Sequence, residues 1–174
     1  MDWESFYKTE HNFKNSTFSD FVFEQIKGDS LVELGCGDGR DLKFFIKNGI
    51  NACGIDKAFE GRNITKQDVL DFIKNNNSPE YVYTRFFWHI VNRDIQLEIL
   101  KWVKGTLFIE ARTAEDRPLN LFTKHKRYLI NVSQLVKDLK DNGFQITYLH
   151  EGRGLSVLKG EDPYLVRIVA KKVN

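Results

Sequence analysis

The feature that most constrains this chain is a turn with three alternate glycines, Gly35-Cys36-Gly37-Asp38-Gly39. It follows an apolar run of strand length at 30–34 and precedes residues 41–47, whose apolar side chains recur on one helical face. Because glycine has no side chain, its backbone can turn tightly and let a ligand approach. In open parallel sheets such a turn stands at the carboxyl end of a strand, where ligands bind. The segment therefore predicts a strand, a binding turn and a helix in succession.

The same alternation of strand-length and helical segments continues along the chain. Apolar runs bounded by turn residues predict strands at 30–34, 51–55, 81–84, 106–109, 144–149 and 165–170, with a further short strand leading to Asp68. Helical spacing predicts helices at 41–47, 94–104 and 133–143, the last with Ser133 as its N-cap and Gly143 as its end. Only a loop separates the last two strands, so they should pair antiparallel at one edge. We expect a Rossmann-like α/β fold, with a seven-stranded, mostly parallel sheet and helices on both faces.

Length and composition favour one ordinary globular domain. A chain of 174 residues with 41% hydrophobic and 29% charged residues fits a single domain over 1–174. Its first part, residues 1–27, is rich in aromatic side chains. We expect this part to form a helical extension, which either packs on the sheet or covers the site as a lid.

Several classes of protein are excluded. No apolar stretch approaches the roughly 18–20 residues needed to span a bilayer, and the first residues carry acid where a secretory signal carries base. We therefore expect a cytoplasmic protein without a membrane span. The two cysteines, Cys36 and Cys53, suit neither a disulfide scaffold nor a CxxC metal site, so no metal is expected.

Charge is distributed unevenly along the chain. Residues 1–110 carry 14 Lys/Arg and 17 Asp/Glu, whereas residues 111–174 carry 12 and 7. This imbalance is too small for a nucleic-acid-binding face, which needs a strongly basic surface, and no nucleic-acid partner is expected. It would suit a small anion bound by the second part of the chain. The alternative is an uneven solvated surface without a function.

Three carboxylates surround the glycine turn: Glu33, Asp38 and Asp41. A dinucleotide would place its pyrophosphate here, and three acids would repel that group in a partly buried cleft. A ligand end that carries an ammonium and a sulfonium would be attracted instead. The glycines also follow GxGxG, not the GxGxxG typical of NAD- and FAD-binding folds. The residues therefore favour S-adenosyl-L-methionine over NAD.

Two further acids stand where such a ligand needs them. Asp56 ends the second predicted strand, at about the 20-residue offset from the turn where a carboxylate accepts both ribose hydroxyls. Asp68 should lie at the end of the short third strand, where it could accept the adenine amino group. Each has a structural alternative: Asp56 begins a turn, and Asp68 caps a helix that starts at Val69.

Three short segments resemble the motifs of a known family, the class I S-adenosyl-L-methionine-dependent methyltransferases. They are ELGCGDG at 33–39, GID at 54–56 and QDV at 67–69. The resemblance covers about residues 28–172 and implies that family's fold, its cofactor and the product S-adenosyl-L-homocysteine. The residues then expected to contact the cofactor are Tyr7, Glu33, Gly35, Cys36, Gly37, Gly39, Asp41, Asp56, Lys57, Asp68, Val69 and Arg85.

A narrower resemblance appears downstream. TRFFWH at 84–89, EAR at 110–112, HKRY at 125–128 and EDPYLVR at 161–167 are similar to small methyltransferase domains associated with bacterial capsule and O-antigen assembly. That resemblance implies an acceptor oxygen on a surface glycan, in a sugar hydroxyl, a phosphate or a phosphoramidate.

Methyl transfer mainly requires that donor and acceptor are aligned and water is excluded. A sugar hydroxyl would also benefit from a general base, for which His89, His125 and Glu110 are candidates. An ionised phosphate-type oxygen needs no base, and cationic side chains would hold it instead. The full set of candidate catalytic and acceptor-binding residues is His89, Arg85, Glu110, Arg112, His125, Arg127 and Arg153.

These candidates have structural alternatives as well. Arg85 could pair with a nearby carboxylate, Glu110 and Arg112 with each other or with other charges, and 124–127 could be a solvated loop. Several cations at one cleft favour an anionic acceptor over a neutral one.

Three functions remain open from the sequence. The preferred one is O-methylation of a small, anionic, glycan-related acceptor. The others are methylation of another metabolite, and an inactive cofactor-binding fold that serves a second enzyme as a partner. An RNA methyltransferase is disfavoured because no RNA-binding module is appended. Both a monomer and a homodimer are compatible with the sequence.

Overall fold

The computed structural model describes residues 14–28, 30–116, 128–157 and 160–173. The strands are β1 (Ser30–Leu34), β2 (Asn51–Asp56), β3 (Ile64–Lys66), β4 (Tyr81–Arg85), β5 (Thr106–Arg112), β6 (Phe144–Gly152) and β7 (Leu165–Lys172). The α-helices are α2 (Thr17–Phe23), α3 (Arg40–Lys47), α4 (Val69–Asn75), α5 (Arg93–Trp102) and α7 (Val132–Asp141). Two 3₁₀ helices, η1 (Trp88–Ile90) and η2 (Ala114–Asp116), follow β4 and β5.

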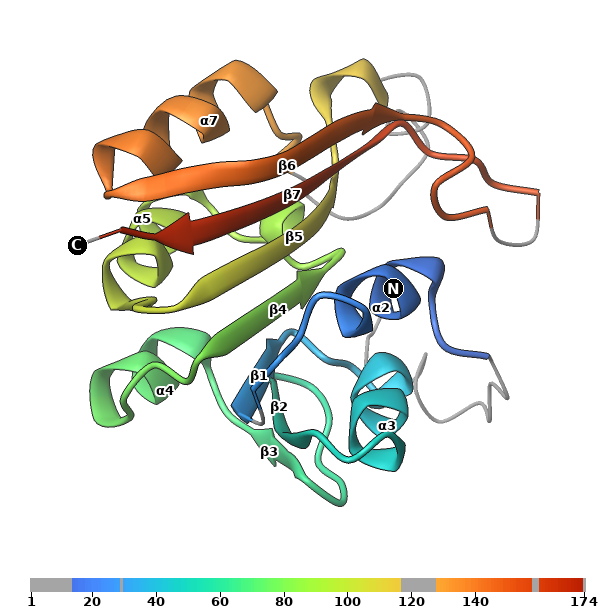
Figure 1. Cartoon of the computed structure of the whole chain (residues 1–174), viewed down its shortest axis with the longest axis vertical. Helices are drawn as coiled ribbons and strands as arrows, with labels where there is room; N and C mark the ends of the chain where they lie inside the picture. Colours follow the sequence, from blue (N-terminus) through green and yellow to red (C-terminus); the bar gives the residue numbers. More distant parts are fainter. Residues whose placement is uncertain (1–13, 29, 117–127, 158–159, 174) are drawn as a thin grey trace.

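The strands form one seven-stranded sheet in the order β3-β2-β1-β4-β5-β7-β6 (Figure 1). The pairs from β3 to β5 are parallel, while β7 is antiparallel to both β5 and β6. The predicted mostly parallel sheet with an antiparallel edge pair is confirmed. The order reverses at β1 and β4, and in such sheets the carboxyl ends beside the reversal form the binding crevice.

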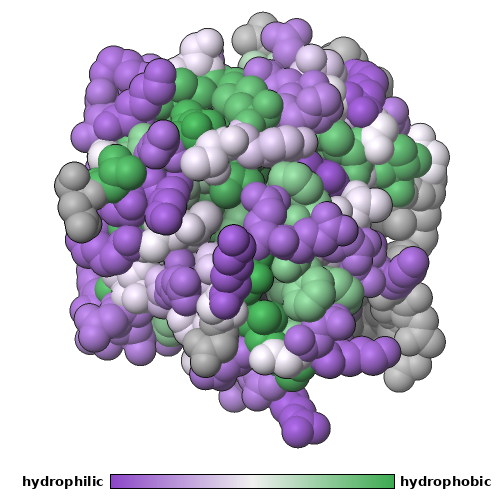
Figure 2. Space-filling view, in the orientation of Figure 1, coloured by the Kyte–Doolittle hydropathy of each residue, from purple (hydrophilic) through white to green (hydrophobic). Residues whose placement is uncertain are grey.

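Helices cover both faces of the sheet, as predicted. On one face α2 and α3 bury Phe18, Val22, Leu42 and Phe45 against side chains of β1, β4 and β5. On the other, α4, α5 and α7 pack against alternate residues of the same strands, such as Val82. Figure 2 shows a hydrophilic outer surface that hydrophobic patches interrupt in several places. The alternation of side chains along each strand therefore divides the core into two layers.

Polar side chains cap the starts of α2, α4, α5 and α7, whereas α3 begins after Gly39 without a side-chain cap. The Ser16 hydroxyl accepts the Ser19 N–H at the start of α2, over 3.0 Å. At the start of α7 the capping residue is Asn131, whose side chain accepts the Gln134 N–H at 3.0 Å. The prediction that Ser133 caps this helix is therefore wrong: Ser133 lies inside the first turn. Asparagine caps as well as serine does, so the helix starts at the earlier of the two. Gly143 follows the helix end in a left-handed conformation, with φ 76°.

Helix α2 is the described part of the predicted extension over 1–27, and it packs on the sheet through Phe18 and Val22. A single domain over 1–174 remains a prediction. Within the described residues, none of the helices has the length and apolar character needed to cross a membrane.

Candidate active site

The glycine turn joins β1 to α3 with three residues in the left-handed region: Gly35, Gly37 and Gly39 have φ of 70°, 56° and 76°. A Cβ on Gly35 would lie 2.3 Å from the ring of Phe87, so the position excludes every side chain. Four of the turn's five amides, those of Gly35, Cys36, Gly37 and Gly39, already have acceptors. The N–H groups of Gly35 and Cys36 donate to the Ile55 carbonyl at 2.7 and 3.2 Å, and that of Gly39 donates to the Cys36 carbonyl at 3.0 Å.

Asp56 lies at the end of β2, directly beside the turn. Its Oδ2 accepts the Gly37 N–H at 2.8 Å, and its Oδ1 accepts the N–H groups of Ala58 and Phe59 at 2.8 and 3.2 Å. The carboxylate therefore supports both the glycine turn and the turn that follows β2. The structural alternative given for Asp56 is present, while its contact with ribose hydroxyls stays a prediction.

Glu33 is buried in β1 below the turn, with 4% of the residue exposed. Its Oε2 has no hydrogen-bond partner in the described structure. Burial raises the pKa of this carboxyl well above its ordinary value, and the nearby charge of Asp41 raises it further, while Arg85 opposes the shift. A buried acid with an unpartnered oxygen is a costly arrangement unless a ligand completes it.

Asp41, in the first turn of α3, is occupied within the protein. Its carboxylate accepts the Ser16 N–H at 2.7 Å, the Ser16 hydroxyl at 2.8 Å and the Tyr83 hydroxyl at 2.8 Å. The Ser19 hydroxyl donates to it at 3.2 Å. Asp41 therefore anchors the start of α2 to α3 and β4. Its negative charge also contributes to the raised pKa of Glu33 below the turn.

Asp68 and its neighbours lie at the edge of the sheet. The Asp68 side chain accepts the Leu70 N–H at 2.9 Å and so caps α4, which begins at Val69 as predicted. Lys57 lies 3.2 Å from the Asp68 carboxylate, and its side chain is 84% exposed. Cys36 is buried inside the turn, where burial raises the pKa of its thiol above the ordinary value. Cofactor contacts by these residues remain predictions.

Glu110, near the end of β5, is enclosed between two arginines (0% exposed). Its Oε1 accepts from Arg85 Nε at 3.0 Å, and its Oε2 accepts from Arg167 Nε at 2.6 Å. Burial by itself lowers the pKa of Arg85, but Glu110 and Asp41 outweigh burial and raise it, so the guanidinium stays charged. The structural ion pair proposed for Arg85 is present. With both oxygens engaged, Glu110 is poorly placed to act as a general base.

His89 and Arg112 meet at the ends of β4 and β5. His89 is 3% exposed, and its Nδ1 accepts the Arg112 backbone N–H at 3.1 Å. Because Nδ1 accepts, the neutral ring carries its proton on Nε2, so neither ring nitrogen is available as a base. The Arg112 side chain pairs with Asp116 and Glu161, each at 2.9 Å. The pairing of Glu110 with Arg112 that the sequence left open does not form.

Phe86, the first residue after β4, has φ 55°, which a bulky side chain rarely adopts. Its N–H donates to the Glu110 carbonyl at 2.9 Å. The ring lies 4.4 Å from the Arg85 guanidinium carbon and 5.8 Å from that of Arg112. Such strained residues cluster at functional sites, and this one connects the arginines at the ends of two strands.

Arg153 lies in the loop between β6 and β7, with 47% of its side chain exposed. It donates to the Asp162 carbonyl and lies 4.0 Å from Asp116. Three predicted site residues, Tyr7, His125 and Arg127, fall outside the described residues.

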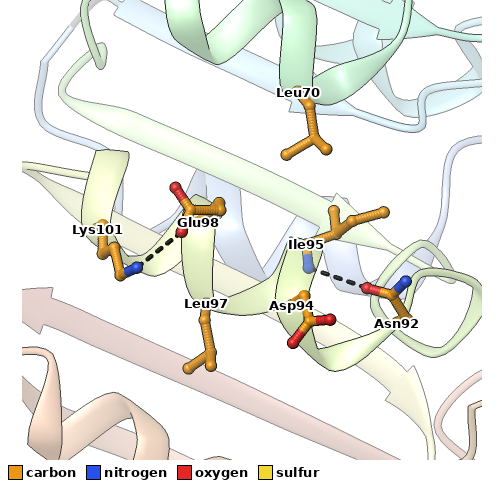
Figure 3. Close-up of a pocket in the computed structure, with 7 residues that line it drawn as sticks. All are labelled: Leu70, Asn92, Asp94, Ile95, Leu97, Glu98 and Lys101. Carbon is orange, nitrogen blue, oxygen red and sulfur yellow. Dashed lines mark hydrogen bonds and ion pairs between the residues drawn. The ribbon is translucent and has the colours of Figure 1, made fainter.

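Two surface hollows lie elsewhere. One, between α4 and α5, is lined by Leu70, Asn92, Asp94, Ile95, Leu97, Glu98 and Lys101 (Figure 3). There Asn92 accepts the Ile95 N–H and Glu98 pairs with Lys101, so these polar groups are satisfied. The other lies at the starts of α5 and α7 and is lined in part by Arg93 and Gln134. Neither contains a predicted site residue.

No sequence pattern pointed to Asp116, and Glu161 and Arg167 stood in the EDPYLVR segment without roles of their own. The alternation of side chains in β7 places Arg167 opposite Glu110, but that contact depends on a strand register that one sequence does not reveal. Phe86 gave no signal, because its positive φ is a property of the folded backbone.

The fold and the glycine turn together define the architecture of the class I S-adenosyl-L-methionine-dependent methyltransferases, whose expected sheet order this chain has. A methyltransferase from Archaeoglobus fulgidus described as dependent on that cofactor matches with a TM-score of 0.69 and 16% identity, over 88% of this chain and 90% of that one. TehB from Haemophilus influenzae matches with a TM-score of 0.71 and 15% identity, over 98% of this chain and 67% of that one.

A third similar structure is magnesium protoporphyrin IX methyltransferase from Synechocystis, solved with bound S-adenosyl-L-homocysteine. Its TM-score is 0.64 at 13% identity, over 98% of this chain and 83% of that one. No family model and no curated protein matches the sequence. At these identities the comparisons show the fold.

Proposed function

We propose that this protein is an S-adenosyl-L-methionine-dependent methyltransferase that acts on a small molecule. The observation that carries the proposal is the buried, unpartnered Oε2 of Glu33 below a glycine turn in which the N–H groups of Gly35, Cys36, Gly37 and Gly39 already have acceptors. A diphosphate needs free N–H groups and a positive field. This turn offers carboxylates instead, and a ligand with an ammonium group and a sulfonium suits them.

Different residues of this chain would bind different parts of the cofactor. Glu33 faces the cationic end from below the turn, while Gly35, Gly37 and Gly39 allow the ligand to approach the backbone. Asp56 would accept ribose hydroxyls, and Asp68 would receive the adenine amino group. When bound, the cofactor supplies an electrophilic methyl group, so the protein has only to align the acceptor and exclude water.

The acceptor atom that fits best is an oxygen that is already ionised. Among the described candidate bases, both carboxylate oxygens of Glu110 accept from arginines and Nδ1 of His89 accepts a backbone N–H, while the third candidate, His125, lies outside the described residues. An ionised oxygen needs no proton removed, so a general base is not required. Together with the resemblance to capsule and O-antigen methyltransferases, this supports a phosphate, phosphoramidate or acidic sugar acceptor in surface-polysaccharide assembly.

Calorimetry with the full chain tests the cofactor assignment. S-adenosyl-L-methionine and S-adenosyl-L-homocysteine should bind, NAD should not, and Glu33→Gln should weaken binding while Glu98→Gln, an exposed change, should not. Binding of NAD alone would overturn the proposal. Transfer of a labelled methyl group to acidic glycan fragments then separates an active enzyme from a cofactor-binding partner protein, which would bind without turnover.

A further inference from the structure

The guanidinium of Arg112 has two very different partners. Nη1 donates to Asp116 Oδ2 at 2.9 Å, and Nη2 donates to Glu161 Oε2 at 2.9 Å. Asp116 is fully buried, whereas the side chain of Glu161 is 64% exposed. The Arg112 side chain itself is only 10% exposed. Nη1 of Arg112 is therefore fixed by a buried carboxylate, whereas Nη2 binds the carboxylate of a largely exposed side chain.

Asp116 is rigidly placed. Its Oδ1 accepts the Tyr164 N–H at 3.0 Å, and its own N–H donates to the Thr113 carbonyl at 3.1 Å. These bonds orient the Arg112 guanidinium before any ligand arrives. Glu161 lies between β6 and β7, and its side chain is 64% exposed, so its carboxylate returns to water when it leaves Arg112. It can therefore leave at small cost.

Arg112 lies on the side of the sheet where an acceptor would stand. Arg85 and Arg112 end β4 and β5, and Glu33 stands one residue before the end of β1, all on the face covered by α2 and α3. Glu33 pairs with Tyr83 and Tyr83 with Phe108, so Arg112 lies two strands across and four residues further along, roughly 16 Å from Glu33 between Cα atoms. The ring of Phe86 lies between Arg85 and Arg112 and joins the two regions.

We propose that Nη2 of Arg112 binds an anionic group of the acceptor, and that Glu161 occupies this position in the unliganded protein and must be displaced. The proposal rests on the methyltransferase function and specifies how its acceptor is recognised. The group is a singly charged oxyanion, either a carboxylate or a phosphate group with one charge. Such a group replaces Glu161 without changing the local charge, whereas a dianion would add a negative charge beside Asp116.

The test is a titration of the full chain with acetate and with dimethyl phosphate, in the absence of cofactor. The side-chain N–H signals of the arginines are followed by nuclear magnetic resonance, with acetamide as the uncharged control. The Arg112 signals, assigned with Arg112→Lys, should shift saturably with the two anions only. Which of the two binds more tightly distinguishes a carboxylate from a phosphate acceptor.

Glu161→Gln removes the competing charge, so it should tighten anion binding roughly two- to fivefold, the factor expected for an exposed ion pair. Glu115→Gln removes the same charge from an exposed neighbour of Asp116 and should not. Equal effects of both variants, no effect of Glu161→Gln, or the same shifts with acetamide would overturn the proposal. If Arg112→Lys does not fold, the comparison of Glu161→Gln with Glu115→Gln still decides.

The outcome is independent of the cofactor. A protein that binds the anions at Arg112 but no S-adenosyl-L-methionine would contradict the proposed function and leave the anion site standing. A protein that binds the cofactor but shows no anion effect would contradict the anion site at Arg112 and leave the proposed function unaffected. Once an acceptor is known, Glu161→Gln should lower its KM and leave the cofactor's Kd unchanged.

Discussion

Glu110 of β5 and Arg167 of β7 stand opposite each other across the antiparallel edge of the sheet, joined by a 2.6 Å bond between Oε2 and Nε. The same guanidinium donates through Nη2 to the Thr17 hydroxyl at 2.8 Å and to the Leu155 carbonyl at 2.7 Å. One buried ion pair thus ties the start of α2 and the loop after β6 to the carboxyl end of the sheet (Figure 1).

Glu110→Gln should strongly destabilise the protein. The substitution leaves Arg85 and Arg167 buried without their shared anion, and breaking a buried pair costs about 3–5 kcal/mol. Urea denaturation measures the change in free energy of unfolding. Glu98→Gln breaks an exposed pair and should cost about 1 kcal/mol or less. Similar losses of unfolding free energy for the two variants would show that the ion pairs of Glu110 with Arg85 and Arg167 contribute little stability.

Gly35→Ala should be far more damaging than Gly49→Ala. Both glycines have positive φ, so each substitution places alanine in a left-handed conformation at about 1–2 kcal/mol. Only at Gly35 would the new Cβ also lie 2.3 Å from the Phe87 ring, since nothing lies within 4 Å at Gly49. Thermal unfolding and cofactor calorimetry measure the difference. Equal Tm values would disprove the steric role of Phe87.

Asp56→Ala should weaken cofactor binding by about 1–3 kcal/mol through the loss of charge-assisted hydrogen bonds. Asp56→Asn keeps one acceptor oxygen for the backbone N–H groups of the turn, and it should lose less. Isothermal calorimetry gives both dissociation constants. Asp71→Ala, an exposed change on α4, serves as the control. An unchanged dissociation constant for Asp56→Ala would reject the ribose role.

Cofactor binding should become tighter as pH rises. Burial and Asp41 raise the pKa of Glu33 above the ordinary 4.5, so this carboxyl retains its proton to higher pH. A cationic ligand favours the ionised form, lowers that pKa and releases the proton. The Kd should therefore fall, by at most about tenfold per pH unit, until the raised pKa is passed.

Calorimetry in two buffers with different ionisation enthalpies counts the released proton. Glu33→Gln should abolish both the release and the pH dependence. A wild-type protein that binds the cofactor without releasing a proton would show that Glu33 does not ionise on binding.

Arg153→Ala should raise the KM for an anionic acceptor and leave cofactor affinity alone, because the arginine lies in the loop beside Asp116, remote from the glycine turn. Steady-state kinetics with each substrate varied in turn separates the two effects. Lys47→Ala, an exposed cation at the end of α3, should change neither value. A change in the cofactor Kd without a change in the acceptor KM would show that Arg153 contributes to cofactor binding and not to acceptor binding.

The cofactor side of the site could be predicted from local patterns. The glycine turn, Glu33 and Asp56 belong to strand ends and a turn that neighbouring residues specify, and parallel strands bring their carboxyl ends to one edge. The helix cap at Asp68 follows from the same local chemistry. The cap of α7 was misplaced because two good capping residues, Asn131 and Ser133, stand close together.

The acceptor side depended on the fold. The sequence shows Arg85, Glu110 and Arg112 as charges near strand ends, and it left open which carboxylate each arginine meets. The register of β4, β5 and β7 decides that Glu110 lies between Arg85 and Arg167, and the loop before β7 decides that Arg112 meets Glu161. Local patterns thus determined the strands, the helices and the binding turn, because these depend on neighbours within a few residues. Only the tertiary structure decided the partners of the buried charges, because those partners come from distant segments whose alignment is set by packing of the whole sheet.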